Sequence, residues 1–248
     1  MRAPGGIGWL LAALVLVATG DGAAAEERLS ARGVVVAAES AVLSARVRAP
    51  IAAMPVRMGD RVARGDAVVT FDCALQEAER TSAVAVLRKA EIVLAQRERL
   101  HERQAAGLSE VREARADAAR ARADVAAIDA LMTGCVLRAP FDGRVAETYA
   151  YPHEQPAPDA PLVKLVGTER LEIDLIVPSL WLRWLKPGAS MRYEVDETAT
   201  AHDAAVTRIG AQVDAVSQTV KITAAFTEPG VPVLPGMSGT GVFVQPGN

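Results

Sequence analysis

The pattern of apolar and polar positions divides the chain into two β-like parts separated by a helical one. Residues 30–71 contain short Val-rich runs interrupted by small and polar residues, a texture typical of short strands. Residues 73–132 contain no proline and a single glycine, Gly107, which favours long helices. After Thr133 short alternating runs return, of which Leu171–Pro178 is the clearest. The pattern therefore predicts a mainly β, multi-domain chain with an inserted helical segment.

The helical segment divides at Gly107 into two arms, each with an apolar stripe. In the second arm, spacings of three and four, typical of a helix that packs along one seam, connect Val111, Ala114, Ala118, Ala121, Val125, Ile128 and Met132. A looser stripe in the first arm consists of Ala83, Val86, Leu87, Ala90, Val93, Leu94 and Leu100. Gly107 is predicted to end the first helix, and Ser109 to cap the second. We therefore expect an antiparallel α-helical hairpin with its tip near residues 105–109 and arms about 40 Å long.

A short phrase is repeated on the two sides of the helical segment. Arg48-Ala49-Pro50-Ile51 corresponds to Arg138-Ala139-Pro140-Phe141, and residues 62–69 correspond to residues 156–163 after an insertion near Tyr149–Pro152. Half-motifs of about 30 residues are too small to bury an apolar face alone. We expect the two to pack face to face as one pseudo-symmetric β-sandwich, with the hairpin inserted at its tip. The short strands that follow predict a small antiparallel barrel or sandwich.

The N-terminal residues predict secretion. Arg2 precedes the apolar run Trp9–Gly20, and the small residues of Ala23–Glu26 fit a signal-peptidase site. We predict a cleaved Sec-type signal peptide over residues 1–25; the alternative is an uncleaved N-terminal anchor. The mature chain would then begin near Glu26 in the periplasm, an oxidising compartment.

Composition and residue spacing argue against several functional classes. The 27 basic and 30 acidic residues provide no excess of positive charge, which argues against a nucleic-acid-binding protein. The three histidines, His101, His153 and His202, lie far apart in the sequence and lack the spacing of metal ligands. No nucleophile-elbow pattern occurs. We predict neither enzymatic activity nor a metal site.

The two cysteines, Cys73 and Cys135, bracket the predicted hairpin. If the arms are antiparallel and in register, the two residues meet at the hairpin base, where an oxidising compartment favours a disulfide. Two buried free thiols are the alternative. The disulfide would close a loop of about 62 residues, which corresponds to roughly 4 kcal/mol in the chain-entropy description.

Three motifs occur in a fixed order along the chain: VRMGDRVARGDAVVTFD at Val56–Asp72, CVLRAPFDGRV at Cys135–Val145, and a final pair at Val213–Ile222 and Val233–Val244. Together they resemble the periplasmic adaptor (membrane fusion) proteins of the HlyD type, over nearly the whole mature chain. The resemblance implies a split lipoyl-like β-sandwich (a barrel-sandwich hybrid), an antiparallel coiled-coil hairpin and a small antiparallel β-barrel. The implied boundaries are 42–72 plus 133–167 for the sandwich, 73–132 for the hairpin, and 29–41 plus 168–246 for the barrel. We expect a short form without the membrane-proximal domain of many relatives.

The resemblance assigns structural roles to the motif residues. Gly59, Gly65 and Gly143 would permit tight or positive-φ turns, Phe141 would plug the core, and Asp142 would cap a turn. The other motif positions with structural roles are Asp60, Asp72, Arg138, Ala139 and Pro140. True lipoyl or biotin carriers place a modifiable lysine where this chain carries the helical insertion. We therefore predict no cofactor.

The resemblance also implies a function and partners. Several copies would form a ring or funnel, with the hairpin tips on an outer-membrane channel and the barrels on an inner-membrane exporter, RND-type in preference to ABC-type. The residues implied in channel contact are Leu100, Arg103, Gly107, Leu108, Ser109 and Arg112. At the tip only Leu108 and Ser109 match the family pattern, because Glu98 and Glu102 occupy the places of its Arg and Leu. A periplasmic scaffold that grips an envelope enzyme, or a ligand-binding module, is the alternative function.

Overall fold

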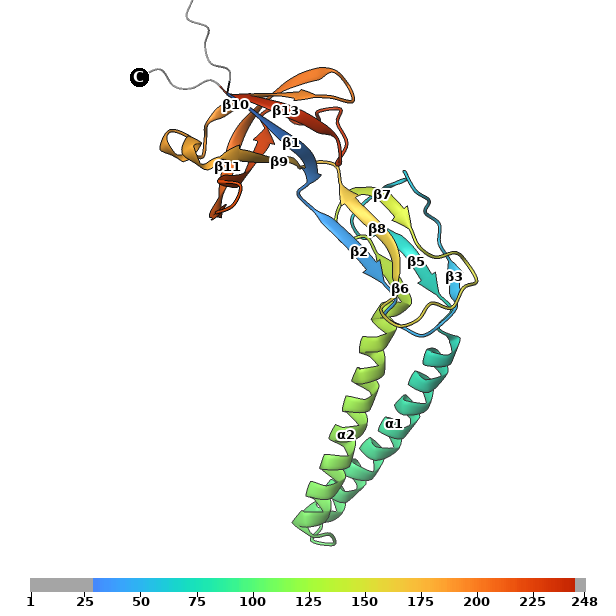
Figure 1. The fold of residues 1–248 in the computed structure, drawn as a ribbon. Helices are drawn as coiled ribbons and strands as arrows, with labels where there is room; N and C mark the ends of the chain where they lie inside the picture. Colours follow the sequence, from blue (N-terminus) through green and yellow to red (C-terminus); the bar gives the residue numbers. More distant parts are fainter. Residues whose placement is uncertain (1–28, 244–248) are drawn as a thin grey trace, which may run out of the picture.

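The computed structural model describes residues 29–243 and contains three units arranged in a line (Figure 1). A β-barrel lies at one end, a helical hairpin at the other, and a β-sandwich connects them. The predicted fold class, mainly β with an inserted helical hairpin, is confirmed. The predicted signal peptide and the last residues of the predicted barrel range lie outside the described residues.

The barrel consists of six antiparallel strands closed in the order β1-β13-β10-β11-β12-β9. Their bounds are β1 Leu29–Ala37, β9 Leu171–Pro178, β10 Ser190–Val195, β11 Thr200–Asp214, β12 Thr219–Phe226 and β13 Ser238–Phe243. A short 3-10 helix, η2 Ser179–Arg183, follows β9. Closure leaves no edge strand in the barrel that could pair with another chain.

Alternation along the strands fills the barrel interior. In β9, Ile173, Leu175 and Val177 are fully buried while their neighbours face outward, which is the period-2 pattern read from the sequence. Tyr193 of β10 is also fully buried, and its hydroxyl group donates a 2.9 Å hydrogen bond to the carbonyl oxygen of Gly33 in β1. Because a buried phenol needs a partner, this bond lets a polar atom lie inside an apolar core.

Tyr193 should make the barrel sensitive to alkaline pH. Burial, helped by the negative charge of Asp196, raises the pKa of Tyr193 to about 12. The folded-state pKa lies above the unfolded value of about 10, so this stabilisation is complete below pH 10 and is lost as the pH rises through 12. Tyr193→Phe should cost about 1 kcal/mol near neutral pH, because the hydrogen bond is lost. Between about pH 8 and about pH 11 the variant should lose less stability than the wild type in urea unfolding. Equal losses in the two proteins would contradict this role.

The sandwich is built from both halves of the sequence repeat. Its strands are β2 Ser40–Ser44, β3 Ile51–Ala53, β4 Arg61–Val62, β5 Ala67–Phe71, β6 Val136–Arg138, β7 Gly143–Thr148 and β8 Pro161–Gly167. One sheet has the order β2-β8-β7-β4 and the other β3-β5-β6. The expectation that each half forms one face is therefore wrong, because each sheet contains strands from both halves. Interleaving lets the short strands of one half complete the hydrogen bonding of the other.

The repeat is visible in the backbone. Gly65 has a φ of 91°, and its predicted counterpart Asp159 has a φ of 61°. Gly59 has a φ of 92°, and His153, its counterpart after the four-residue insertion, has a φ of 73°. Positive φ is costly for residues other than glycine, so its recurrence at matched positions shows that both halves make the same turns.

Three motif residues of the second half differ from the roles implied by the resemblance. Gly143 does not lie in a positive-φ turn but begins strand β7. Phe141 is only partly buried and packs against the edge of the core, so it is not a core plug. Its counterpart Ile51 is fully buried instead. Asp142 does not cap its own turn: its carboxylate accepts a 2.8 Å hydrogen bond from the backbone N–H of Arg64, in the turn of the first half.

The remaining motif residues fix turns and hold the two halves together. The carboxylates of Asp60 and Asp72 accept backbone hydrogen bonds from Arg57 and Ala74. Across the halves, Arg138 donates to the carbonyl oxygen of Gly65, and the Ala139 backbone bonds to that turn in both directions. Ala139 is buried, whereas the neighbouring Pro140 is exposed.

The hairpin consists of α1 Ala74–Glu102 and α2 Leu108–Met132, which is followed by the 3-10 turn η1 Thr133–Cys135. The seam predicted for α2 faces α1: Val111, Ala114, Ala118 and Ala121 are buried, and the last three seam residues are partly buried. The stripe predicted for α1 is wrong at Val86 and Val93, which are exposed. Four cross-helix ion pairs follow the seam: Arg80–Asp129, Glu91–Arg122, Glu98–Arg115 and Arg97–Glu110.

A disulfide joins Cys73 and Cys135 at the hairpin base, with their Cα atoms 6.1 Å apart. Both cysteines pack against the sandwich core, so the bridge fixes the two helix ends to the sandwich as well as to each other. The sandwich begins at Ser40 with β2, so the boundary predicted after residue 41 is slightly late and falls inside a strand.

Candidate docking site at the hairpin tip

A tight loop joins the two helices at the tip. Helix α1 ends at Glu102, and Gln104 adopts a left-handed backbone with a φ of 57°. The N–H of Gln104 donates to the carbonyl oxygen of His101, and the N–H of Ala105 donates to that of Leu100, which is the Schellman arrangement. The His101 ring nitrogen Nδ1 lies 2.9 Å from the Ala106 carbonyl oxygen. These bonds hold the loop in one conformation.

The predicted helix boundaries at the tip are wrong in two respects. Gln104, and not Gly107, provides the left-handed residue that ends α1. Gly107 has an extended backbone and is the N-cap of α2, so Ser109 lies inside the first turn and does not cap the helix. The earlier left-handed turn reverses the chain at once, which leaves Ser109 exposed on the helix surface.

Gln104 offers a direct test of this loop geometry. Glycine adopts a left-handed backbone without the strain that other residues incur there, so Gln104→Gly should stabilise the hairpin by up to about 1 kcal/mol. Ala105→Gly, one position along at ordinary φ, should destabilise it slightly. Urea unfolding followed by helical circular dichroism measures both. A loss of stability in Gln104→Gly would show that the loop does not adopt this turn.

The six predicted contact residues come together at the tip. Leu100, which is partly buried, and the exposed Arg103 come from the end of α1; Gly107, Leu108, Ser109 and Arg112 begin α2 and are exposed. Leu108 is 50% exposed, which makes it the most prominent apolar side chain of this group. Glu98 forms a 2.8 Å ion pair with Arg115 and so joins the helices. An exposed leucine flanked by arginines and a serine can dock on another protein, but it offers no arrangement for catalysis.

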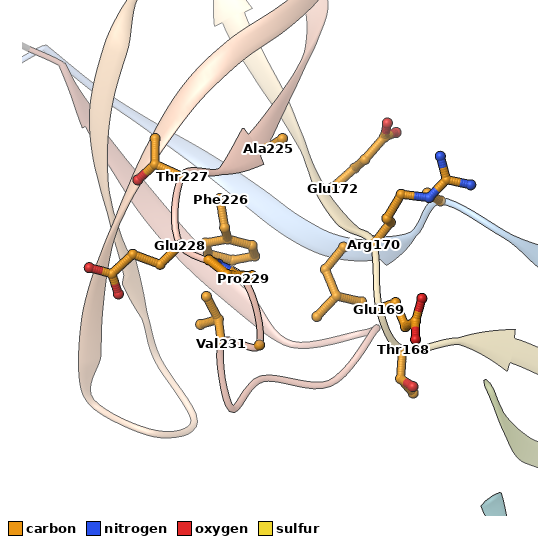
Figure 2. A pocket seen from close by; sticks show the side chains of 13 residues that line it. Thr168, Glu169, Arg170, Glu172, Ala225, Phe226, Thr227, Glu228, Pro229 and Val231 are labelled. Atoms are coloured by element: carbon orange, nitrogen blue, oxygen red, sulfur yellow. The ribbon is translucent and has the colours of Figure 1, made fainter. Parts of the chain in front are cut away.

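A second feature is a pocket of about 330 Å³ at the junction of barrel and sandwich (Figure 2). The Phe226–Val231 segment lines one side of it, and Thr168–Glu172 lines the other. Two of its charged residues are already engaged: Arg170 pairs with Glu39, and Glu172 pairs with Arg208. The chain passes between the sandwich and the barrel at Ala38 and Thr168, which both line this pocket. The pocket is therefore part of the connection between the two units.

Residues 29–243 lack both a metal-binding cluster and a membrane-spanning helix. No group of three or more His, Cys, Asp or Glu side chains in this range is placed to hold a metal ion. No helix in this range is both long enough and apolar enough to cross a membrane.

Comparisons with solved structures identify the fold. The membrane fusion protein Spr0693 of Streptococcus pneumoniae R6 superposes with a TM-score of 0.73 at 16% identity, covering 88% of this chain and 100% of that one. A MacA-MexA chimera with the α-hairpin of Pseudomonas aeruginosa MexA gives a TM-score of 0.76 at 18% identity, covering 88% and 82%. The chain has the membrane fusion protein fold. The resemblance inferred from the three motifs is thereby confirmed for the fold.

The sequence of the chain is also similar to that of a nodulation protein. The nodulation protein NolF of Rhizobium meliloti (strain 1021) is 28% identical over 195 residues, which cover 73% of this chain and 53% of NolF. The chain thus spans about half the length of that relative. No protein-family model matches the chain.

The sequence did not predict a candidate site at the distal end of the barrel, which is the end that points away from the sandwich. Exposed aliphatic side chains gather there on η2 and on the β11–β12 turn. No sequence signal marks them, because Leu180 and Leu182 flank the buried Trp181 in an apolar run that reads as core. Among the barrel aromatics, Trp181 and Tyr193 are buried in the core.

Proposed function

We propose that this protein is the periplasmic adaptor of an export system and bridges an inner-membrane exporter to an outer-membrane channel. The observation that carries the proposal is the position of the hairpin and the barrel at opposite ends of an elongated molecule (Figure 1). The hairpin tip would meet the channel and the barrel the exporter. The function is mechanical: the chain spans a gap and seals a conduit, and no reaction is catalysed.

The length of the hairpin and the fixed alignment of its helices suit a rigid spacer between two partners. Its 29-residue first helix corresponds to about 44 Å at 1.5 Å per residue. A small-residue seam brings the helices close together, and the cross-helix ion pairs fix their register. Each exposed pair stabilises the hairpin by no more than about 1 kcal/mol. Their contribution is therefore mainly to alignment, which a bridge between two membranes requires.

Side-by-side assembly of several copies is the second part of the proposal. Helix α1 leaves Val86 and Val93 exposed at 57% and 38%, and their spacing of seven residues places them on one side of the helix. An exposed apolar pair on the side of a two-helix hairpin suits contact with a neighbouring hairpin, because burial of this surface is favourable. A ring or funnel of copies would result. We favour an RND-type exporter as the inner-membrane partner, with an ABC-type exporter as the alternative.

In-cell photocrosslinking tests the proposal. A photoreactive residue at Leu108 should capture an outer-membrane channel, identified by mass spectrometry. A matched probe at Ala126, exposed on the same helix near its base, should not capture that channel. Capture of a periplasmic enzyme from Leu108 would replace the export function with that of a scaffold.

A further inference from the structure

Five exposed aliphatic side chains lie at the end of the barrel that points away from the sandwich. They form what we term the distal patch: Ile176 (63% exposed), Leu180 (65%), Leu182 (38%), Val213 (41%) and Val216 (96%). Strand pairing brings them together, because Pro178 at the end of β9 pairs with Thr219, and Thr219 pairs with Asp214 at the β11–β12 turn. Exposed apolar residues grouped in this way mark contact surfaces more often than scattered single ones do.

The distal patch is held in a fixed conformation. The Ser179 N–H donates a 2.8 Å hydrogen bond to the Gln218 carbonyl oxygen, which ties η2 to the β11–β12 turn. Within that turn the carboxylate of Asp214 accepts hydrogen bonds from the backbone N–H groups of Ser217 and Val216 and from the Ser217 hydroxyl. These bonds, that of the Ser217 backbone first, lower the pKa of Asp214. The turn therefore keeps its carboxylate occupied and presents Val216 at its apex.

Charge and aromatic residues around the distal patch add a second signal. Residues 176–186 carry two basic side chains, Arg183 and Lys186, both exposed, and no acidic one. Trp184 lies between them, half-buried, with its ring 5.6 Å from that of Trp181. Aliphatic residues that protrude beside tryptophan and basic side chains are typical of protein surfaces that contact a lipid headgroup layer.

We propose that the distal patch contacts the surface of a phospholipid bilayer that contains anionic headgroups. The side chains of Leu180 and Val216 would enter the headgroup–acyl boundary, while Arg183 and Lys186 would bind headgroup phosphates. This proposal goes beyond the export function and does not depend on it.

The charge beside the distal patch favours an anionic bilayer over a protein partner. Arg183 and Lys186 are exposed next to the aliphatic side chains of η2, and residues 176–186 contain no carboxylate that would repel anionic headgroups.

Vesicle binding tests the proposal. The protein is expressed from the full chain and purified from the periplasm, where removal of Trp9 with the signal peptide leaves Trp181 and Trp184 as reporters. It should co-sediment with phosphatidylethanolamine–phosphatidylglycerol vesicles more than with phosphatidylcholine vesicles, and less at high salt. Brominated lipids should quench its tryptophan fluorescence. Leu180→Ser combined with Val216→Ser should weaken binding about tenfold, because the inserted apolar area is lost.

The control is Val42→Ser, which removes an equally aliphatic, 52% exposed side chain from the sandwich and should leave vesicle binding unchanged. Absence of wild-type binding to anionic vesicles, or equal binding by the double variant, would overturn the proposal. A photocrosslink from Val216 to a membrane transporter, without any vesicle binding, would replace the bilayer with a protein partner.

Discussion

Removal of the Cys73–Cys135 disulfide is expected to lower the free energy of unfolding by about 4 kcal/mol. The bridge spans a sequence separation of 62 residues, so in the chain-entropy description it strongly restricts the unfolded chain. Its position at the base of a hairpin whose helices otherwise share a thin seam makes the loss visible in the helices first. Guanidinium unfolding of Cys73→Ala/Cys135→Ala, followed by helical circular dichroism, measures the effect.

Reduced wild-type protein is the matched control for this prediction. It should unfold at the same denaturant concentration as the double alanine variant, because both lack the bridge. A thiol assay on the unreduced protein shows whether the cysteines are paired. Paired cysteines with no difference in unfolding between oxidised and reduced protein would contradict the stabilising role assigned to the bridge.

Gly143→Ala is expected to destabilise the sandwich by about 3 kcal/mol. A Cβ atom at Gly143 would lie 2.3 Å from the Val166 carbonyl oxygen and 3.0 Å from its carbonyl carbon. Both atoms belong to the backbone of the neighbouring strand β8, which pairs with β7 and β2 and cannot move without breaking those pairings. The sequence motif therefore requires glycine here for close strand approach; no positive φ is involved.

Gly107→Ala provides the comparison. A Cβ atom there would meet only the Ser109 hydroxyl oxygen, at 3.5 Å, so the change should cost no more than about 1 kcal/mol, the usual scale for alanine at an N-cap. Thermal unfolding of both variants measures the difference. Similar melting temperatures for the two would show that β8 can move away from β7 at little cost.

Sequence periodicity predicted those elements in which one face alone is apolar. Strand β9 matches the predicted Leu171–Pro178 because alternate residues face the barrel core. The α2 seam was predictable because the larger apolar residues Val111, Val125, Ile128 and Met132 share one helical spacing with alanines. A second stripe at the same spacing consists of alanines alone and is exposed: Ala116, Ala119, Ala123, Ala126 and Ala130. In α1 two apolar stripes compete, and only the packing against α2 decides that Leu87 and Leu94 turn inward while Val86 and Val93 stay exposed.

The tip and the distal patch show where periodicity does not suffice. Gln104 adopts positive φ because two backbone hydrogen bonds, from Gln104 to His101 and from Ala105 to Leu100, close the end of α1. The residue type does not predict this turn, since glutamine is not typical of left-handed positions. Leu180 and Leu182 read as core because their neighbours Trp181 and Leu185 are buried. Their exposure depends on the direction in which η2 leaves β9, and this direction is set by the hydrogen bond from Ser179 to the β11–β12 turn.

The proposed bridge between two membranes requires that one molecule contacts a partner in each. Recovery of both partners in a single assembly is the most direct test. Cells would carry this chain with an affinity tag and photoreactive residues at both Leu108, on the tip, and Glu194, exposed on β10 of the barrel and outside the distal patch. After crosslinking and purification through the tag, mass spectrometry would identify the proteins joined at each position. We predict an outer-membrane channel attached through Leu108 and an inner-membrane exporter attached through Glu194, in the same particle. Assemblies that contain a periplasmic enzyme at Leu108, with no protein of the outer membrane, would contradict the account.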